Sequence, residues 1–301
     1  MFNKENNSWY LNELSYNGKL YHYTNDIGYN GIFDKKHDFD DNIILRLTRI
    51  DCLEDRQERK HIQETVKNVA KQLRDEKLIL EGFYNKVINY RPTNCGFTTC
   101  VTDTYDRETN NNTIGINYGK TDYYIACFST NSNNQYIINE MKCTKRINFT
   151  SSFSKISNPQ RTEKNESGFL NFIFNFDNYE PCKSFQSCSL EYYMKRVLYN
   201  DQEKEKLIKK RLIEISNDTN NFPSNLEQMY YLFDGFFKAK KFEKEEEVRL
   251  LVKFPKLDSN IKELEKNHVV FADDNDNNIP KKYLYVPINS IFLEENNVTD
   301  I

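Results

Sequence analysis

The run YYIACFS at residues 123–129 is the strongest candidate for the centre of the fold. It is almost wholly apolar, and Asp122 and further polar residues bound it on its two sides. A short apolar run between polar flanks is typical of a central strand that is buried on both faces. The run ends on Ser129, so a hydroxyl group follows the buried residues. We therefore expect a sheet with residues 123–129 at its centre.

Alternation of apolar and polar side chains with a period of two predicts further strands before and after this run. In the first of them Leu20, His22 and Thr24 share one face, and Tyr21 and Tyr23 share the other. The strands that we expect from this pattern are residues 19–24, 43–48, 147–153, 169–176, 247–254, 283–286 and 288–293, with Pro287 between the last two.

Helical spacing predicts one long helix over residues 54–84 and another helix over residues 191–215. Asn25 is the expected N-cap of a short helix through about residue 33. Ser224 and Glu227 form a capping box before a later helix. That later helix carries an aromatic and apolar stripe that we expect in the core: Leu226, Met229, Tyr230, Phe233, Phe236 and Phe237.

The length of 301 residues suits one domain over residues 1–301, and the polar stretch without pattern at 157–167 predicts a surface loop. Of the residues, 38% are hydrophobic and 14% are aromatic, so the core should be rich in rings. The net charge of −3 excludes a global positive field that would attract nucleic acid. No apolar run approaches the ~18 residues of a membrane span. We therefore expect a soluble, cytoplasmic protein that does not bind membranes.

The cysteine and histidine residues predict neither a disulfide framework nor a metal centre. The seven cysteines are odd in number and include no C-x-x-C pair. His37, His61 and His268 do not have the spacing of metal ligands with each other or with the cysteines, so no metal is expected. The glycine-rich loops of common nucleotide-binding folds are also missing from the sequence.

Four short motifs occur in order along the chain: HYT at 22–24, EDRQE at 54–58, CFS at 127–129 and EEEVR at 245–249. In this order they resemble a widespread uncharacterised bacterial family whose members read H-Y-T, N-D-x-x-E, C-F-S and E-x-E-x-R. The resemblance covers roughly residues 19 to 293. The chain departs from that pattern at Glu54, where Asn is preferred, and at Arg56, where Pro is usual. It also lacks the Trp and the Gly-rich strand expected after Ser129.

The same layout is similar to the ADP-ribosyltransferase superfamily, whose site surrounds nicotinamide adenine dinucleotide (NAD). The resemblance implies an α+β fold with a split, mostly antiparallel sheet and flanking helices, and with NAD as co-substrate between the sheet halves. It implies a bacterial toxin or anti-phage effector that transfers ADP-ribose to nucleic acid, to a protein or to water, and it leaves room for a partner or antitoxin protein. The residues implied at the site are Glu247, Glu245 and His22 for catalysis, and His22, Tyr23, Thr24, Arg46, Ser129 and Arg249 for NAD.

The chemistry of this reaction accounts for the late carboxylates. Cleavage of the bond between nicotinamide and ribose passes through an oxocarbenium-like state, which a nearby carboxylate stabilises. On a strand, Glu245, Glu247 and Arg249 share a face, so one carboxylate contacts the ribose while the other activates the acceptor. Arg249 would orient them or pair with phosphate. In this interpretation His22 hydrogen-bonds a ribose hydroxyl, and Ser129 braces the carboxylate or the nicotinamide ribose.

Each of these residues also has an ordinary structural interpretation that the sequence leaves open. His22 would be a buried histidine that donates to a backbone carbonyl, and the glutamates would form ion pairs at an exposed strand end. Arg46 would form a surface salt bridge. Cys127 is expected to be an inert buried thiol with a raised pKa rather than a nucleophile with His22 as its base.

Two further functions remain as alternatives. One is a sensor or interaction domain of the same fold whose catalytic site has decayed. The other is a metal-dependent, nuclease-like effector that uses Asp55, Glu58 and the late glutamates. In the absence of a metal, Asp55 and Glu58 are first-turn acids favoured by the helix dipole.

Overall fold

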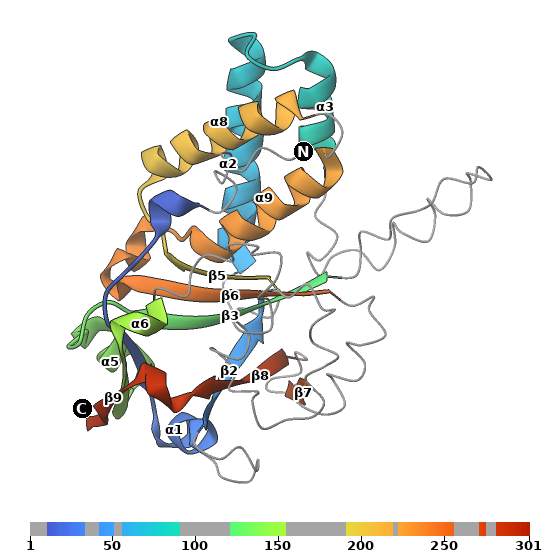
Figure 1. The fold of residues 1–301 in the computed structure, drawn as a ribbon. Helices are drawn as coiled ribbons and strands as arrows, with labels where there is room; N and C mark the ends of the chain where they lie inside the picture. The colour runs from blue at the N-terminus through green and yellow to red at the C-terminus, as the bar shows by residue number, and fades with distance from the viewer. Residues whose placement is uncertain are drawn as a thin grey trace.

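The structure is a computed structural model of the 301-residue chain (Figure 1). Strands and helices are both abundant, and the sheet is antiparallel, so the expected α+β class is confirmed. The structure describes residues 11–33, 42–50, 56–90, 121–154, 191–218, 222–255, 271–274 and 281–301.

The described strands join one sheet through antiparallel pairs. Strand β3 lies at its centre, as its apolar run predicts. The strands expected near residues 19–24, 43–48, 123–129 and 247–254 are all confirmed. The strands are β1 Leu20–Thr24, β2 Asn42–Arg49, β3 Thr121–Ser129, β4 Lys145–Phe149, β5 Glu191–Arg196, β6 Glu247–Pro255, β7 Phe271–Asp274, β8 Lys281–Asn289 and β9 Leu293–Asp300.

The sheet divides into two limbs at one edge of β3. Along its other edge β3 pairs with β6 over the whole range from Thr121 to Ser129. On the divided edge, β1 pairs with β3 at Ser129, whereas β2 pairs with it at Tyr124 and Ile125. One limb therefore continues through β1, β4 and β9, and the other through β2, β8 and β7. We call the stretch of β3 between these two pairings, residues 126–128, the fork.

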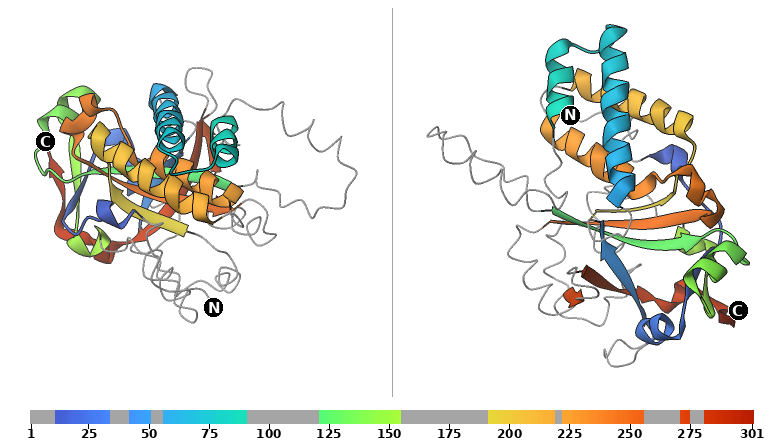
Figure 2. Two further views of the ribbon diagram at one scale, coloured as in Figure 1. Left: turned by 90° about the horizontal axis from the view of Figure 1, so that it is seen from above. Right: turned by 180° about the vertical axis from the view of Figure 1, so that it is seen from behind.

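Four helices cover one face of the sheet: α2 Arg56–Asp75, α3 Glu81–Asn89, α8 Asp201–Asn217 and α9 Phe222–Phe236. Figures 1 and 2 show them together on one side of β3, β5 and β6. The shorter helices are α1 Asp26–Ile32, α5 Gln135–Met141 and α6 Ser151–Ser154, with 3₁₀ turns η2 Asn12–Leu14, η6 Lys240–Glu245 and η8 Ser290–Phe292. Asn25 caps α1 as expected, because its side chain accepts from the Gly28 N–H.

Two apolar clusters lie on opposite faces of the sheet because the side chains of β3 and β6 alternate. Ile125 and Leu251 pack with α2, α8 and α9 on the helix-covered face. Phe128 and Val248 pack with residues of β1, β2 and β4 on the other face. The stripe along α9 is buried on the helix-covered face, from Leu226 to Phe237, so its assignment to the core is confirmed.

The single long helix expected over residues 54–84 is wrong, because the chain breaks between α2 and α3. Lys77 adopts the left-handed conformation with φ of 59°. The Leu78 N–H then donates to the Leu73 carbonyl at 2.8 Å, which is the bonding pattern of a Schellman cap. Glycine usually occupies that position. Because Lys77 and not a glycine occupies this position, the sequence pattern did not predict the break between the two helices.

The helix expected over residues 191–215 is also wrong in its first part, which forms strand β5. β5 pairs with β6, and Tyr193 and Met194 are buried on opposite faces. Aromatic side chains favour strands, although the charged residues that follow dominate the composition. Asn200 accepts from the Glu203 N–H and starts α8 at Asp201.

Three further boundaries differ from expectation. The strand expected at 147–153 ends at Phe149 and gives way to α6. Helix α9 begins at Phe222, so Ser224 lies within its first turn and not at its N-cap. Strand β8 continues through Pro287, which pairs with Ile44 of β2. On its other edge β8 pairs with β7 only at residues 281–284, so Pro287 lies past that pairing. A proline is tolerated where its missing N–H lies on an edge that needs no ladder bond, and no described strand pairs with this edge of β8 at Pro287. The expected loop at 157–167 and strand at 169–176 lie outside the described residues.

Candidate functional site

Three adjacent strands bring segments that are far apart in the sequence into one row. Tyr21 of β1 pairs with Ser129 of β3, and Ser129 pairs with Glu247 of β6. Partners in an antiparallel ladder point to the same face, so these side chains lie side by side on the helix-covered face. The next row on that face holds Cys127 and Arg249.

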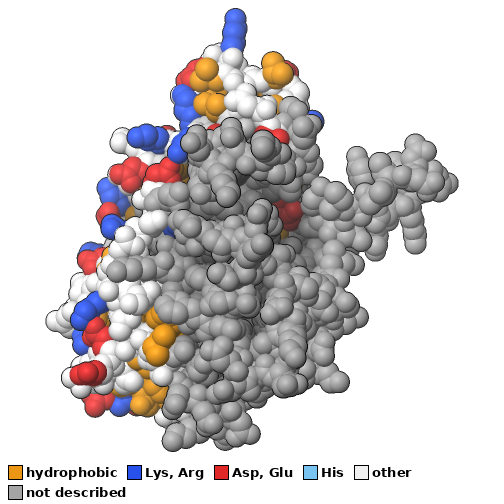
Figure 3. All heavy atoms as spheres, viewed as in Figure 1, with side chains coloured by type: hydrophobic (Ala, Val, Ile, Leu, Met, Phe, Trp, Pro, Cys, Tyr) orange, Lys and Arg blue, Asp and Glu red, His pale blue; other side chains and the backbone are white. Residues whose placement is uncertain are grey.

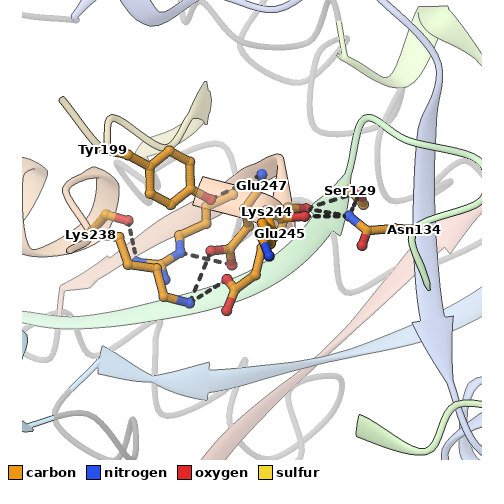
Figure 4. A network of polar contacts seen from close by, with 9 residues as sticks. Ser129, Asn134, Tyr199, Lys238, Lys244, Glu245 and Glu247 are labelled. Atoms are coloured by element: carbon orange, nitrogen blue, oxygen red, sulfur yellow. Dashed lines mark hydrogen bonds and ion pairs between the residues drawn. The ribbon is translucent and has the colours of Figure 1, made fainter. Parts of the chain in front are cut away.

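Glu247 lies between two cations at the end of β6 (Figure 4). Its Oε1 accepts from Nε of Arg249 at 3.0 Å, and its Oε2 is 3.4 Å from Nζ of Lys238. Arg249 also donates to the Gly235 carbonyl of α9 at 2.9 Å. Glu247 is 6% exposed and Arg249 is 3% exposed. The pair is therefore shielded from water, a setting in which charges persist only when they are paired and hydrogen-bonded.

Glu245 is the second carboxylate, and it lies at the end of η6. The next residue, Glu246, is left-handed with φ of 49° and leads the chain into β6. Oε2 of Glu245 is 2.5 Å from Nζ of Lys238, so Lys238 bridges the two carboxylates. Oε1 of Glu245 forms no hydrogen bond or ion pair with any residue that the structure describes.

The two carboxylates respond to these surroundings in opposite directions. Burial alone raises the pKa of a carboxyl group. For Glu247, the positive charges of Arg249 and Lys238 outweigh burial and lower the pKa to about 2. For Glu245, burial and the negative charge of Glu247 outweigh Lys238 and raise the pKa. One carboxylate is thus kept as an anion while the other accepts a proton more readily, which is the arrangement of an acid–base pair.

Tyr199 fixes the backbone of Glu247 from the segment that follows β5. Its hydroxyl accepts from the Glu247 N–H at 3.2 Å, and the Val197 N–H donates to the Glu247 carbonyl at 2.9 Å. Burial, together with the negative charge of Glu247, raises the pKa of Tyr199. Its hydroxyl therefore stays protonated and supports the strand end without adding charge.

Cys127 presents its thiol beside Glu247 at the fork. The thiol keeps solvent-accessible surface although protein atoms surround it closely, so the expectation of a buried thiol is wrong. Burial and the negative charge of Glu247 raise the pKa of Cys127, in the expected direction. The neighbouring thiol in turn helps to lower the pKa of the Glu247 carboxyl. With its own pKa raised, the thiol stays protonated and is not a thiolate nucleophile.

Ser129 braces the turn that carries Glu245. Its hydroxyl donates to the Glu245 carbonyl at 3.1 Å, so it supports the backbone of the turn and not the carboxylate. The side chain of Asn134 donates to the carbonyls of Lys244 and Glu245 at 2.9 and 3.1 Å. The Asn134 N–H in turn donates to the Tyr23 hydroxyl at 2.9 Å. Tyr23 of β1 is thereby connected to the turn before β6.

His22 lies on the opposite face of the sheet from Glu247. Its ring centroid is 5.7 Å from that of Phe128, which belongs to the other apolar cluster. Its Nδ1 is 2.9 Å from the Cys127 carbonyl oxygen, and because a carbonyl only accepts, Nδ1 carries the proton. Burial lowers the pKa of His22, the hydrogen bond offsets part of this, and Arg46 adds to the lowering. The structure thus places a neutral imidazole at the fork and does not bring it into the carboxylate pair.

The remaining expected residues do not belong to the carboxylate pair. Thr24 ends β1, where its hydroxyl donates to the Asn25 carbonyl at 3.4 Å. Arg46 is exposed on β2, on the other limb of the fork. Asp55 lies outside the described residues, and so does the side chain of Glu58.

Sequence reasoning missed three residues of the site. Lys238 directly follows the apolar stripe of α9 and looked like an ordinary charged residue at a helix end. Tyr199 was hidden in the segment expected to be helical. Asn134 had a usable signal, because it precedes a short apolar helix and its side chain caps that helix by accepting from the Ile137 N–H.

Searches for a metal site and for a membrane span within the described residues found neither. No group of three or more His, Cys, Asp or Glu side chains there could hold a metal ion. None of the described helices is both long and apolar enough to cross a bilayer. Comparisons with protein-family models, with curated proteins and with solved structures found no match.

Proposed function

We propose that this chain is an ADP-ribosyltransferase-like enzyme that uses NAD as co-substrate and transfers ADP-ribose to a macromolecule or to water. The observation that carries the proposal is the row of Tyr21, Ser129 and Glu247 on adjacent strands, with Glu245 beside it. These are the segments that the resemblance to the superfamily expects around the dinucleotide. The fork in the sheet supports the same proposal, because a split sheet is the implied architecture.

Glu247 is the carboxylate that faces the developing positive charge in this proposal. The pKa of Glu247, lowered to about 2, keeps it anionic at neutral pH, as electrostatic stabilisation of an oxocarbenium-like ribose requires. NAD would supply the ADP-ribosyl group: the bond between the nicotinamide nitrogen and C1′ breaks, and nicotinamide leaves with the electron pair as a neutral molecule. Arg249 and Lys238 hold Glu247 in place for this step.

Glu245 is the group that receives the acceptor's proton. The acceptor oxygen or nitrogen forms its bond to C1′ and loses a proton, which passes to a general base. The raised pKa of Glu245 suits that role better than the lowered pKa of Glu247. The unbonded Oε1 of Glu245 is the atom that would take the proton. Tyr23 and Arg46 remain the proposed contacts to the dinucleotide along β1 and β2, whereas His22 and Thr24 lie on the face of β1 opposite to Glu247 and are given no contact in this arrangement.

The direct test follows nicotinamide release from NAD by the purified chain and by Glu247→Gln and Glu245→Gln variants. Glu246→Gln is the matched control, because Glu246 is exposed and lies between the two in sequence. We expect the rate to fall about 10²- to 10³-fold for Glu247→Gln and about 10²-fold or more for Glu245→Gln, with no change in the control. A measurable wild-type rate that neither variant lowers would overturn the assignment.

A second candidate, an interaction domain with a decayed site, is favoured by one observation. Both oxygens of Glu247 are already engaged by cations, and its side chain is almost fully buried. The same assay separates the two candidates, since a decayed site would release no nicotinamide from the wild type. A metal-dependent nuclease has less support, because Glu245 and Glu247 already pair with Lys238.

The setting and the acceptor belong to the proposal as well. We propose a cytoplasmic bacterial effector of the toxin or anti-phage type. Figure 3 shows positive and negative side chains interspersed over the described part of one face, so this face does not favour a nucleic acid over a protein as acceptor. Transfer from labelled NAD to DNA, RNA and protein in parallel reactions identifies the acceptor class, and label in free ADP-ribose alone indicates hydrolysis.

A further inference from the structure

Lys238 contacts both members of the carboxylate pair. Its Nζ is 2.5 Å from Oε2 of Glu245 and 3.4 Å from Oε2 of Glu247. Arg249, by contrast, bonds the other oxygen of Glu247. The Lys238 side chain is 13% exposed, so water screens this bridge only weakly. The distance between the two carboxylates therefore depends on the ammonium group between them.

The backbone and an aromatic ring fix the position of that ammonium group. The Lys238 N–H donates to the Leu198 carbonyl at 3.1 Å, and the Leu198 N–H donates to the Phe236 carbonyl at 2.7 Å. This ties the residue to the chain after β5 on one side and to the end of α9 on the other. Its Nζ also lies 4.7 Å from the ring centroid of Phe242 in η6, within the range of a cation–π contact.

Among the described residues, only one oxygen of Glu245 has a hydrogen-bonding or ion-pair partner, and that partner is Lys238. Two buried carboxylates of like charge repel each other unless a cation or a proton lies between them. Without Lys238, Glu245 would turn away from Glu247 or stay protonated. With Lys238 bonded to Oε2, the side chain is held beside Glu247 while Oε1 forms no hydrogen bond or ion pair with a described residue.

We propose that Lys238 is the positioning residue of the carboxylate pair: its ammonium group holds Glu245 beside Glu247 and directs the unbonded oxygen of Glu245 toward the acceptor. This inference rests on the proposed function and deepens it. The charge is available for the task, because Glu247 and Glu245 outweigh burial and raise the pKa of Lys238.

The first test does not depend on catalysis. Carboxyl resonances of ¹³C-labelled glutamate are titrated by NMR in the full chain, with Glu245→Gln to assign the Glu245 signal. We expect the pKa of Glu245 to rise in Lys238→Gln, because Lys238 lowers it in the wild type. Lys238→Arg keeps the charge and should stay close to the wild type. Lys240→Gln, an exposed lysine of η6, is the matched control. An unchanged titration of Glu245 in Lys238→Gln overturns the proposal.

A companion comparison covers the case in which Lys238→Gln does not fold. The double variant Lys238→Gln/Glu245→Gln removes both partners of the shorter ion pair and leaves no new unpaired charge at that contact. Compared with Glu245→Gln alone, it should raise the pKa of Glu247, because Lys238 is one of the charges that lower it. If the pKa of Glu247 is the same in the double variant and in Glu245→Gln, the proposal is wrong.

The second test measures the reaction. In Lys238→Gln we expect kcat for nicotinamide release to fall about tenfold or more while KM for NAD stays within about twofold, since positioning acts on the chemical step. Lys238→Arg should restore most of kcat. A higher KM for NAD with an unchanged kcat would contradict a positioning role. If the wild type releases no nicotinamide, the proposed function fails, and the NMR titration still decides whether Lys238 controls the pair.

Discussion

Within β6, the two ends of the stretch Glu247–Leu251 are buried to a similar extent on one face but by different chemistry. Leu251 is fully buried against α9, where a Cβ on Gly235 would approach it to 3.2 Å. Two residues earlier, Arg249 is 3% exposed, and Glu247 before it is 6% exposed. A buried ion pair generally stabilises a fold no more than apolar side chains of the same volume. The difference shows that stability alone does not account for the charged end of this stretch, which is where the proposed site lies.

The largest effect is expected when one member of the ion pair is removed. Arg249→Met leaves the Glu247 carboxylate buried with Lys238 as its remaining cation and also removes the bond to the Gly235 carbonyl. We expect the free energy of unfolding to fall by about 3–5 kcal/mol. Urea denaturation of the variant and the wild type measures it. If the free energy of unfolding falls by less than about 1 kcal/mol, Arg249 is not needed to compensate the buried charge of Glu247.

The apolar end should lose stability by a different mechanism. Leu251→Ala removes a fully buried side chain between β6 and α9, and the cavity should cost about 2–5 kcal/mol. The same denaturation experiment measures this loss. The nicotinamide-release rate of the folded variant should stay at the wild-type level, because Leu251 does not touch the carboxylate pair. If the folded variant releases nicotinamide more slowly than the wild type, the apolar end also contributes to the reaction and the comparison fails.

Acidification should reduce the contribution of Glu247 to the stability of the fold. The pKa of Glu247 is about 2 in the folded chain against an ordinary 4.5. A lowered folded pKa stabilises the protein above the unfolded pKa, and this contribution is lost as pH falls from about 4.5 toward 2. The loss should be on the order of 3 kcal/mol. The contribution of Glu245 to stability has the opposite sign, because a raised pKa lowers stability at neutral pH and protonation restores it.

Thermal unfolding between about pH 5 and about pH 2 isolates the contribution of Glu247. The wild type should lose stability faster on acidification than Glu247→Gln, which lacks the titrating group. Parallel pH profiles for the two proteins would mean that Arg249 and Lys238 do not lower the pKa of Glu247 in the folded chain.

A smaller effect is expected at the turn that supports Glu245. Asn134→Ala removes the cap of α5 and the two bonds to the carbonyls of Lys244 and Glu245. We expect a loss of about 1–2 kcal/mol by denaturation, with a modest fall in the reaction rate as the turn loosens. Gln135→Ala, on the exposed side of the same helix, should change stability by less than about 0.5 kcal/mol. Equal effects of the two substitutions would contradict the bracing role.

Local patterns predicted the elements whose signals are short-range. The apolar run of β3, the alternation of β6 and the cap at Asn25 each depend on a few neighbouring residues, and each is confirmed. The break at Lys77 and the strand β5 depend on tertiary contacts, so periodicity and composition missed them.

The candidate site divides in the same way. The glutamates stood out because they belong to the EEEVR motif before an alternating strand, and Ser129 because it ends the apolar run of β3. Lys238 and Tyr199 act only through contacts that the fold creates between β5, α9 and β6. The expected meeting of His22 with Glu247 relied on proximity in the fold alone, and strand alternation puts their side chains on opposite faces.

The most direct test of the account uses the double variant Glu247→Leu/Arg249→Met. It replaces the ion pair with apolar side chains of similar size and leaves Lys238 paired with Glu245. The account predicts that this protein unfolds close to the wild-type urea midpoint but releases no nicotinamide from NAD, whereas the wild type does. Nicotinamide release at the wild-type rate by the double variant, or none by the wild type, would contradict the claim that the charged end of β6 is the reactive site.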